Sequence, residues 1–371
     1  MIKRYLVRAT ILTFLVLNGA NLFAQKSIIK KLLSEGSDST RSASFIPLPA
    51  ISYSQETGLG FGIVSLYSFY SDRSDTVTRS SLISGVATYT MKKQSNLFIK
   101  TDIWTPQNKF HHTEEIRFKN FPFNYYGVGN STFEADKELV KHKLFKLKGE
   151  LQKKISKTVF TGVSLSFENY TYVSEKGTKF DNGQVLFLGI SQIIDSRNIN
   201  TYTTKGAYIG FTYSYAPNVF GSGNFYGSLV ELNLKKFTSL NSKLVLGFNA
   251  NYESLFGNSA PFHLLRQLGG DEMMRGYYYG RYRDKNFIAA QAEIRYRFLP
   301  RFGLVGFAGG GSVYNNDGFK FSELKPSYGA GFRYFFDVQR GLSIRIDYGI
   351  GEKTTNEKRQ KGMYISLGEA F

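Results

Sequence analysis

Apolar and polar residues alternate with a period of two along most of the chain from Phe45 onward. The clearest case runs from Ile288 to Phe298, where every even position is apolar and every odd position after Ala289 is polar or charged. The polar members are Gln291, Glu293, Arg295 and Arg297. Successive side chains of a strand point to opposite faces, so this period predicts strands with one apolar and one polar face.

Sixteen segments with this alternation can be counted, and each is roughly ten residues long. Their predicted starts are Phe45, Leu59, Arg79, Asn96, Lys109, Leu139, Thr158, Gln184, Lys205, Phe225, Lys243, Phe287, Phe302, Ser327, Leu342 and Met363. A soluble β-sandwich has the same alternation with its apolar face buried. The 16% aromatic content and the even strand number favour an all-β fold, a transmembrane antiparallel β-barrel of 16 strands.

The lengths of the connections predict which end of the barrel faces outward. If the chain enters the first strand from the periplasm, the longer connections 121–136, 268–284, 314–326 and 352–362 are extracellular. Most of the other connections are short turns, and the segment Ser71–Thr78 is the exception. Long extracellular loops and short periplasmic turns are typical of bacterial outer-membrane barrels.

The longest insert between two strand patterns is Leu268–Asp284, and it contains three arginines and four tyrosines. A loop of this length in a strand-rich protein is functional or disordered. Its aromatic and arginine content is a poor composition for disorder. We therefore predict an ordered insert.

The N-terminus has the composition of a secretory signal peptide. Lys3, Arg4 and Arg8 precede the apolar run Ile11–Leu17, and Ala24 is the predicted last residue before cleavage. A membrane anchor is the alternative, but the run is shorter than the ~20 residues that a spanning helix needs. We divide the chain into a signal peptide (1–24), a short periplasmic tether (25–43) and an outer-membrane β-barrel domain (44–371).

Composition excludes several kinds of site. The chain has no Cys, which removes disulfides and thiolate metal sites, and its four His residues show no metal-ligand spacing. The sequence singles out no combination of Ser, His and a polar or acidic residue of the kind that hydrolases use. We therefore predict no enzyme activity, cofactor or metal. The net charge is +18, of which residues 1–24 supply three. The remaining positive charge suits binding to an anionic lipid surface or to an acidic partner. The alternative is that it serves solubility alone. Nucleic acid is a poor candidate as a partner, because the protein is predicted to be exported.

Several motifs resemble the BamA/TamA outer-membrane assembly superfamily, whose barrels are of the bacterial surface antigen type. The strongest is the insert itself, with Gly269-Gly270, Met274-Arg275-Gly276-Tyr277 and Gly280-Arg281-Tyr282-Arg283-Asp284, followed by Gln291-Ala292-Glu293-Ile294-Arg295. Weaker matches are Pro49-Ala50-Ile51-Ser52-Tyr53-Ser54-Gln55-Glu56-Thr57-Gly58, Tyr126-Gly127-Val128-Gly129-Asn130 and Asp195-Ser196-Arg197-Asn198. In this order they span the chain from about residue 45 to its end.

The resemblance implies that the insert is the sixth extracellular loop, folded back into the lumen. Its arginine would be held by acidic side chains of the inner wall. We call this contact between loop and wall the loop lock. In this chain the resemblance assigns it to Met274, Arg275, Gly276, Tyr277 and Glu293, with Arg275 as the anchor and Glu293 as its partner. The alternative is that Arg275 only seals the lumen. The second wall acid of the family aligns with Gly309, which implies a weaker lock.

The final strand is predicted to contain Met363, Ile365, Leu367 and Phe371, and it ends the chain on an aromatic residue. Such an end resembles the assembly signal of outer-membrane barrels. The resemblance also implies a poorly paired seam between this strand and the first one, near Pro47–Ser54. Prolines in that first strand cannot donate backbone hydrogen bonds, which suits a weak seam.

The leading hypothesis is an outer-membrane protein of this superfamily that assists insertion or translocation of other proteins, without the periplasmic POTRA domains of its relatives. The expected partners are outer-membrane lipid and lipopolysaccharide, client outer-membrane or secreted proteins, and a periplasmic or lipoprotein partner in place of the POTRA domains. The alternative is a pore, or a structural barrel subunit that depends on a partner for client binding.

Overall fold

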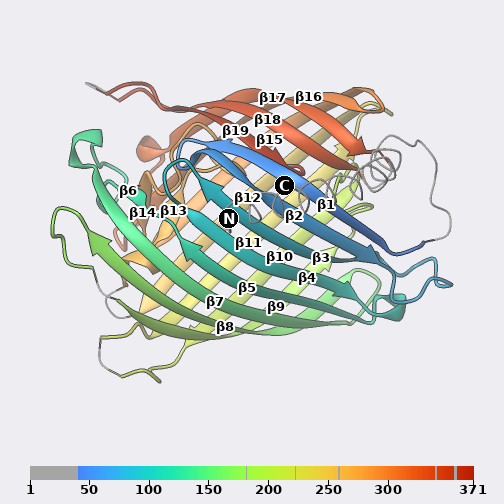
Figure 1. The fold of residues 1–371 in the computed structure, drawn as a ribbon, viewed down its shortest axis with the longest axis horizontal. Coiled ribbons are helices and arrows are strands. Elements are labelled where there is room, and N and C mark those ends of the chain that lie inside the picture. Colours follow the sequence, from blue (N-terminus) through green and yellow to red (C-terminus); the bar gives the residue numbers. More distant parts are fainter. Residues whose placement is uncertain (1–40, 181, 222, 258–259, 339–340, 355–356) are drawn as a thin grey trace, which may run out of the picture.

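The computed structural model describes residues 41–371 except 181, 222, 258–259, 339–340 and 355–356, and in this part the chain forms a closed antiparallel barrel (Figure 1). The predicted signal peptide and all of the predicted tether except residues 41–43 lie outside the described residues. No helix in the described part is long and apolar enough to cross a membrane.

Sixteen strands form the barrel wall. They are β1 (Ser44–Ser54), β2 (Gly58–Phe69), β3 (Ser81–Thr90), β4 (Ser95–Trp104), β5 (Phe110–Asn120), β7 (Glu138–Lys154), β8 (Val159–Ser174), β9 (Gly183–Asp195), β10 (Gly206–Ala216), β11 (Gly227–Ser239), β12 (Leu244–Gly257), β15 (Asn286–Leu299), β16 (Phe302–Tyr314), β17 (Lys325–Asp337), β18 (Leu342–Ile350) and β19 (Lys361–Leu367). Each begins within two residues of its predicted start, so the predicted number and order of strands are confirmed.

The remaining elements are short and belong to connections. β6 (Phe123–Tyr125) pairs with the beginning of β7, and β13 (Arg266–Leu268) pairs with β14 (Tyr282–Asp284) inside the long insert. The single-turn helices are η1 (Pro106–Asn108), η2 (Glu134–Asp136), η3 (Phe262–Leu264) and η4 (Phe321–Glu323). All four connections that were predicted to be extracellular lie at one end of the barrel, which we call the loop end. The opposite end is the turn end.

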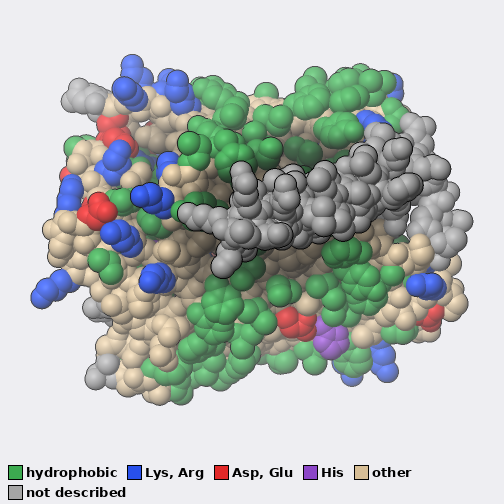
Figure 2. Space-filling model, viewed as in Figure 1, with side chains coloured by type: hydrophobic (Ala, Val, Ile, Leu, Met, Phe, Trp, Pro, Cys, Tyr) green, Lys and Arg blue, Asp and Glu red, His purple; other side chains and the backbone are tan. Residues whose placement is uncertain are grey.

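The apolar face of the strands is the outer face of the barrel. On β15, Ile294 and Tyr296 are 47% and 44% exposed, whereas Glu293 and Arg295 are each 1% exposed. Hydrophobic side chains cover much of the middle of the wall, and charged side chains gather toward the ends (Figure 2). A sandwich would bury its apolar face, so this distribution identifies a barrel whose wall matches a lipid environment.

The barrel closes poorly between β1 and β19. The pairing of β1 with β2 is continuous from Ser44↔Ser68 to Ser54↔Gly58, but β1 and β19 share the single register pair Tyr53↔Ile365. We call this junction the seam. Because a strand edge is stabilised mainly by backbone hydrogen bonds to its neighbour, the seam is the weakest junction of the wall.

The last four residues do not continue the final strand, so the prediction of a strand that reaches Phe371 is wrong. β19 ends at Leu367, and Gly368 takes a φ of +78°, a conformation that glycine adopts without the steric cost of a side chain. The chain then turns into the lumen. The Phe371 ring packs at 5.7 Å from the Phe237 ring, and Arg295 Nη2 donates a hydrogen bond of 2.9 Å to the Phe371 carbonyl.

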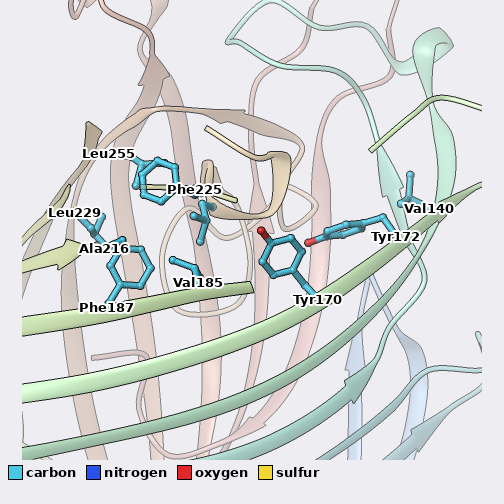
Figure 3. Close-up of a cluster of buried hydrophobic side chains, with 10 residues drawn as sticks. Val140, Tyr170, Tyr172, Val185, Phe187, Ala216, Phe225, Leu229 and Leu255 are labelled. Carbon is cyan, nitrogen blue, oxygen red and sulfur yellow. The ribbon is translucent and has the colours of Figure 1, made fainter. Parts of the chain in front are cut away.

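An apolar cluster fills the lumen at the loop end. Its buried members are Val140, Tyr170, Tyr172, Val185, Phe187, Ala216, Phe225, Leu229, Leu255 and Leu264. Figure 3 shows the labelled side chains, most of them on strands of the wall, gathered in the interior. A lumenal cavity of about 810 Å³ lies beside this cluster and is lined by charged residues of the wall and of the long insert. The insert is therefore held in a lumen that is partly apolar and partly charged.

Candidate functional site

The connection between β12 and β15, residues 258–285, is called L6, and its described part folds into the lumen. Met274, Arg275 and Tyr277 are each at most 1% exposed. The β13–β14 hairpin forms the base of the loop. Gly269 permits the sharp entry into the tip, because its φ is +116° and a Cβ there would lie 2.3 Å from the Tyr278 carbonyl oxygen.

Arg275 lies at the centre of L6 and contacts two carboxylates of the inner wall. Its Nη2 is 2.5 Å from Glu293 Oε1 on β15, and its Nη1 is 2.7 Å from Asp347 Oδ2 on β18. The guanidinium also lies 3.5 Å from the centre of the Phe307 ring. All three charged side chains are fully buried. A buried guanidinium between two carboxylates fixes both the position and the orientation of the loop tip.

The second acid comes from β18 rather than from the strand after β15, where the family resemblance placed it. The residue predicted to replace it, Gly309, lies on β16, where a Cβ would meet the Ala290 carbonyl oxygen at 2.3 Å. Asp347 supplies a second carboxylate from β18 instead, so the expectation that Arg275 lacks a second wall acid is wrong, whereas the strength of the lock stays a prediction. The alternation of Ser343, Arg345 and Asp347 predicts that this carboxylate faces inward, but it does not predict which loop residue it meets.

The two carboxylates belong to a larger buried network of charges. Glu293 also pairs with Arg295 at 2.8 Å, and Asp347 also pairs with Arg333 at 2.5 Å. Arg333 in turn pairs with Glu369 of the C-terminal tail at 2.8 Å. The network thus connects the tip of L6 to the tail that turns into the lumen. Because each buried carboxylate is shared by arginines, no member is left as an uncompensated buried charge.

L6 also contacts both sides of the seam. On β19, the Tyr364 hydroxyl accepts a hydrogen bond of 3.0 Å from the Gly276 N–H and donates one of 3.1 Å to the Tyr277 carbonyl. The Ser366 hydroxyl donates to Asp271 Oδ2 at 2.7 Å. These bonds attach the final strand to the loop.

The other side of the seam contributes the turn between β1 and β2. Gln55 Nε2 donates to the Gly276 carbonyl at 3.1 Å, and the Tyr279 N–H donates to Glu56 Oε1 at 2.5 Å. Gln55 also donates directly to the Lys361 carbonyl on β19. Burial raises the pKa of the Glu56 carboxyl above its ordinary value. We call the bonds from Gln55, Glu56, Tyr364 and Ser366 to L6 the cross-seam hydrogen bonds.

The connection 121–137 covers L6 from the loop end. The Gly129 N–H donates to the Arg283 carbonyl at 2.8 Å, and Arg281 Nη1 donates to Thr132 Oγ1 at 2.7 Å. The Asn124 N–H donates to the Tyr278 hydroxyl at 3.0 Å. Two of the sequence motifs, Tyr126–Asn130 and the L6 motif, are thus in contact.

The structure places the remaining predicted site residues in different environments. Met274 and Tyr277 belong to a second buried apolar cluster, and the Tyr277 hydroxyl donates to the Pro326 carbonyl at 2.7 Å. Met363 and Leu367 face outward with 40% and 43% exposure. Phe371 lies inside the barrel, and Ile365 forms the register pair with Tyr53 at the seam. Within the described residues, no group of three or more His, Asp or Glu side chains is placed to hold a metal ion.

Two kinds of comparison identify similar proteins. The Omp85 superfamily domain matches residues 150–371. The fold is similar to BamA from Haemophilus ducreyi lacking POTRA domains 1-3, with a TM-score of 0.59 and 12% identity, covering 88% of this chain and 70% of that chain. It is also similar to CdiB from Acinetobacter baumannii, with a TM-score of 0.55 and 11% identity, covering 89% of this chain and 66% of that chain. For CdiB from Escherichia coli the TM-score is 0.57 and the identity 9%, covering 92% of this chain and 69% of that chain. No curated protein sequence matches this chain.

The first prediction concerns the buried ion pair. Glu293→Lys should lower the free energy of unfolding by about 3–5 kcal/mol, because it places a second cation beside Arg275 in a buried site. Adding Arg275→Glu should restore part of the loss. The measurement is the temperature at which the folded barrel changes its mobility on a gel. Glu168→Lys is the control, since the Lys146–Glu168 pair is partly hydrated and should cost less. If the single variants at Glu293 and Arg275 both unfold at the same temperature as the wild type, the proposed role of the Arg275–Glu293 ion pair in holding the loop is contradicted.

The second prediction concerns the space that the tip of L6 needs. A Cβ at Gly349 would lie 2.5 Å from the Arg275 carbonyl carbon and from the Gly276 nitrogen. Gly349→Val should therefore displace the tip and expose Arg275 to trypsin in the folded barrel. Gly149→Val on β7 is the matched control, because a Cβ there has no neighbour within 4 Å. Equal resistance of the two variants to trypsin would contradict the predicted close approach.

Proposed function

Because this chain belongs to the Omp85 superfamily, we propose that it assists the insertion or translocation of other proteins at the bacterial outer membrane by opening the seam between β1 and β19. The family and the barrel fold make it an outer-membrane barrel of the insertion or translocation type. The specific role, the opening of the seam and the identity of its clients are our proposal.

The observation that carries the proposal is the single register pair at the seam. Apart from Tyr53↔Ile365, no described residue of β1 forms a register pair with β19, although the two strands lie side by side. Unpaired backbone groups at a strand edge bind another strand by β-augmentation. Pro47 and Pro49 have no backbone N–H group and cannot donate hydrogen bonds along this edge. Their presence weakens any permanent pairing of β1 there. A strand of a client protein could therefore replace β19 beside β1 at low energetic cost.

In this proposal L6 holds the seam closed when no client is bound. The cross-seam hydrogen bonds attach the tip of L6 to the β1–β2 turn and to β19, while Arg275 attaches the same tip to β15 and β18. Side-chain bonds through the loop thus replace the missing backbone bonds between the strands. Opening the seam requires breaking a few hydrogen bonds at the loop end rather than a continuous ladder.

The partners follow from the same reasoning. The clients would be outer-membrane or secreted proteins, and the lipid partners would be outer-membrane lipid and lipopolysaccharide. The described residues contain no POTRA-like domain, so a periplasmic or lipoprotein partner would deliver the clients. The alternative function, a pore, is favoured only by the lumenal cavity of about 810 Å³. L6, the connection 121–137 and the apolar cluster occupy the loop end of the lumen, which supports the insertion proposal instead.

The third prediction tests the seam directly. Tyr53→Cys together with Ile365→Cys places a disulfide at the one register pair of the seam, in a chain that has no other cysteine. Under oxidising conditions this variant should lose most of its ability to accelerate the folding of a client barrel into liposomes, and a reductant should restore it. The matched control is Ile63→Cys with Ala87→Cys, which joins β2 and β3 within the continuous wall.

The control disulfide should leave activity unchanged, because β2 and β3 do not need to separate. Full activity of the oxidised seam variant would exclude opening at the seam. Absence of activity in the wild-type protein and in both reduced variants would exclude the insertion function itself.

The fourth prediction concerns the cross-seam hydrogen bonds. Tyr364→Phe with Ser366→Ala removes three hydrogen bonds between β19 and L6 without changing the outer face. At roughly 1 kcal/mol each, the loss should increase amide hydrogen exchange in β19 by about a hundredfold. Hydrogen-exchange mass spectrometry of the barrel in liposomes measures the effect. Tyr348→Phe, an outward-facing change on β18, should leave exchange at the seam unchanged. Unaltered exchange in the double variant would show that L6 does not hold the seam.

A further inference from the structure

The outer face of the barrel has a hollow of about 620 Å³ near the loop end, over β3, β4, β5, β7 and β8. Its lining includes Leu97, Phe118 and Phe145 as the apolar part and Asn120 and Lys143 as polar members. Two strands, β1 and β2, lie between the seam and the first strand of the hollow. The hollow is therefore separate from the site described above.

Strand register arranges most of the lining in rows across β4, β5, β7 and β8. The row nearest the loop end is Ser95↔Asn120↔Lys143↔Thr171, and the next row is Leu97↔Phe118↔Phe145↔Asn169. The third row is Ile99↔Ile116↔Leu147↔Phe167. Polarity thus falls from a fully polar row to a fully apolar row within four residues of each strand. Such a gradient on an outward face matches the boundary between lipid headgroups and acyl chains.

The apolar part of the hollow is open to the membrane. Leu97 and Phe118 are 50% and 52% exposed, and the rings of Phe118 and Phe145 lie 5.0 Å apart. The residues between them along the strands face the lumen instead, as the ion pair between Lys146 and Glu168 shows. The hollow thus has an aromatic floor onto which an acyl chain can pack.

The polar row contains one cation without an ion pair. Lys143 is exposed, and no carboxylate of the described residues lies within 4.0 Å of its ammonium group. Lys141, two residues away on the same outward face, has only the long contact of 3.8 Å with Glu175. A lysine beside lipid directs its ammonium group toward the headgroup layer, where an anion can meet it.

We propose that this hollow binds a phosphorylated, acylated glycolipid of the outer leaflet. An acyl chain lies on Leu97, Phe118 and Phe145, and a phosphate group meets the Lys143 ammonium. The row of amide and hydroxyl side chains crosses four strands, a width of roughly 14 Å at the usual strand spacing. That width suits a headgroup of two sugars with several hydroxyl groups better than a single glycerol phosphate. The proposal depends on an outer-membrane location but not on insertion activity.

Native mass spectrometry of the purified, full-length mature barrel in detergent tests the proposal, with lipid A as the probe. Lys143→Gln should weaken lipid A binding by about fivefold, the contribution of one lysine near an anionic lipid. Lys143→Arg keeps the charge and should bind like the wild type. Lys153→Gln is the matched control, because Lys153 lies on the same strand with the same outward parity at the turn end. Each variant is first checked for heat-dependent gel mobility, and Phe118→Ser provides a second test of the acyl contact.

Three results would overturn the proposal. Equal weakening by Lys153→Gln would indicate non-specific attraction to a basic barrel. Equal binding of lipid A without its phosphates would exclude the contact with Lys143. Equal or tighter binding of phosphatidylglycerol would identify the site as one for phospholipid rather than glycolipid. Selective loss of lipid A binding in Lys143→Gln and Phe118→Ser, with Lys143→Arg unchanged, is the expected outcome.

Discussion

The buried contact of Arg275 with Glu293 and Asp347 is the interaction on which the arrangement of the lumen depends. A guanidinium taken from water into a barrel lumen is stable only where carboxylates with good geometry compensate it. Two strands, β15 and β18, supply those carboxylates, so the tip of L6 has one position that satisfies all three charges. Glycine at position 349 leaves room for the loop backbone at that position. The ion pairs and the local lack of a side chain therefore specify the same placement.

A fixed loop tip has a direct consequence for the seam. A transmembrane barrel must satisfy its backbone hydrogen bonds within the wall, and an unpaired edge in lipid is costly. Between β1 and β19 only Tyr53 and Ile365 are in register, and the missing support comes from L6 through the cross-seam hydrogen bonds. In the proposed function, these few side-chain bonds at one end are the ones that must break for the seam to open. We regard this combination as the physical basis of the proposed function.

The C-terminal tail joins the same network from the turn end. Glu369 pairs with Arg333, which also contacts Asp347, and the Phe371 carbonyl accepts a hydrogen bond from Arg295. The end of the chain is thus attached to the arginines that compensate the carboxylates around Arg275. The loop, the tail and the seam share charged partners, so a change in one alters the compensation of the others. The outer wall is different, since its apolar and polar rows are set by strand register alone.

The sequence by itself determined the strand number, order and approximate boundaries, because a period of two is a local property that each strand carries independently. It also placed Glu293 on the inner face and marked the L6 motif. Only the tertiary structure decided that Asp347 rather than a residue near Gly309 is the second acid, and that the chain turns inward after Leu367. Both depend on contacts between segments far apart in the sequence. Alternation assigns a side chain to a face of the wall, but the path of a loop through the lumen decides which side chains on that face it meets.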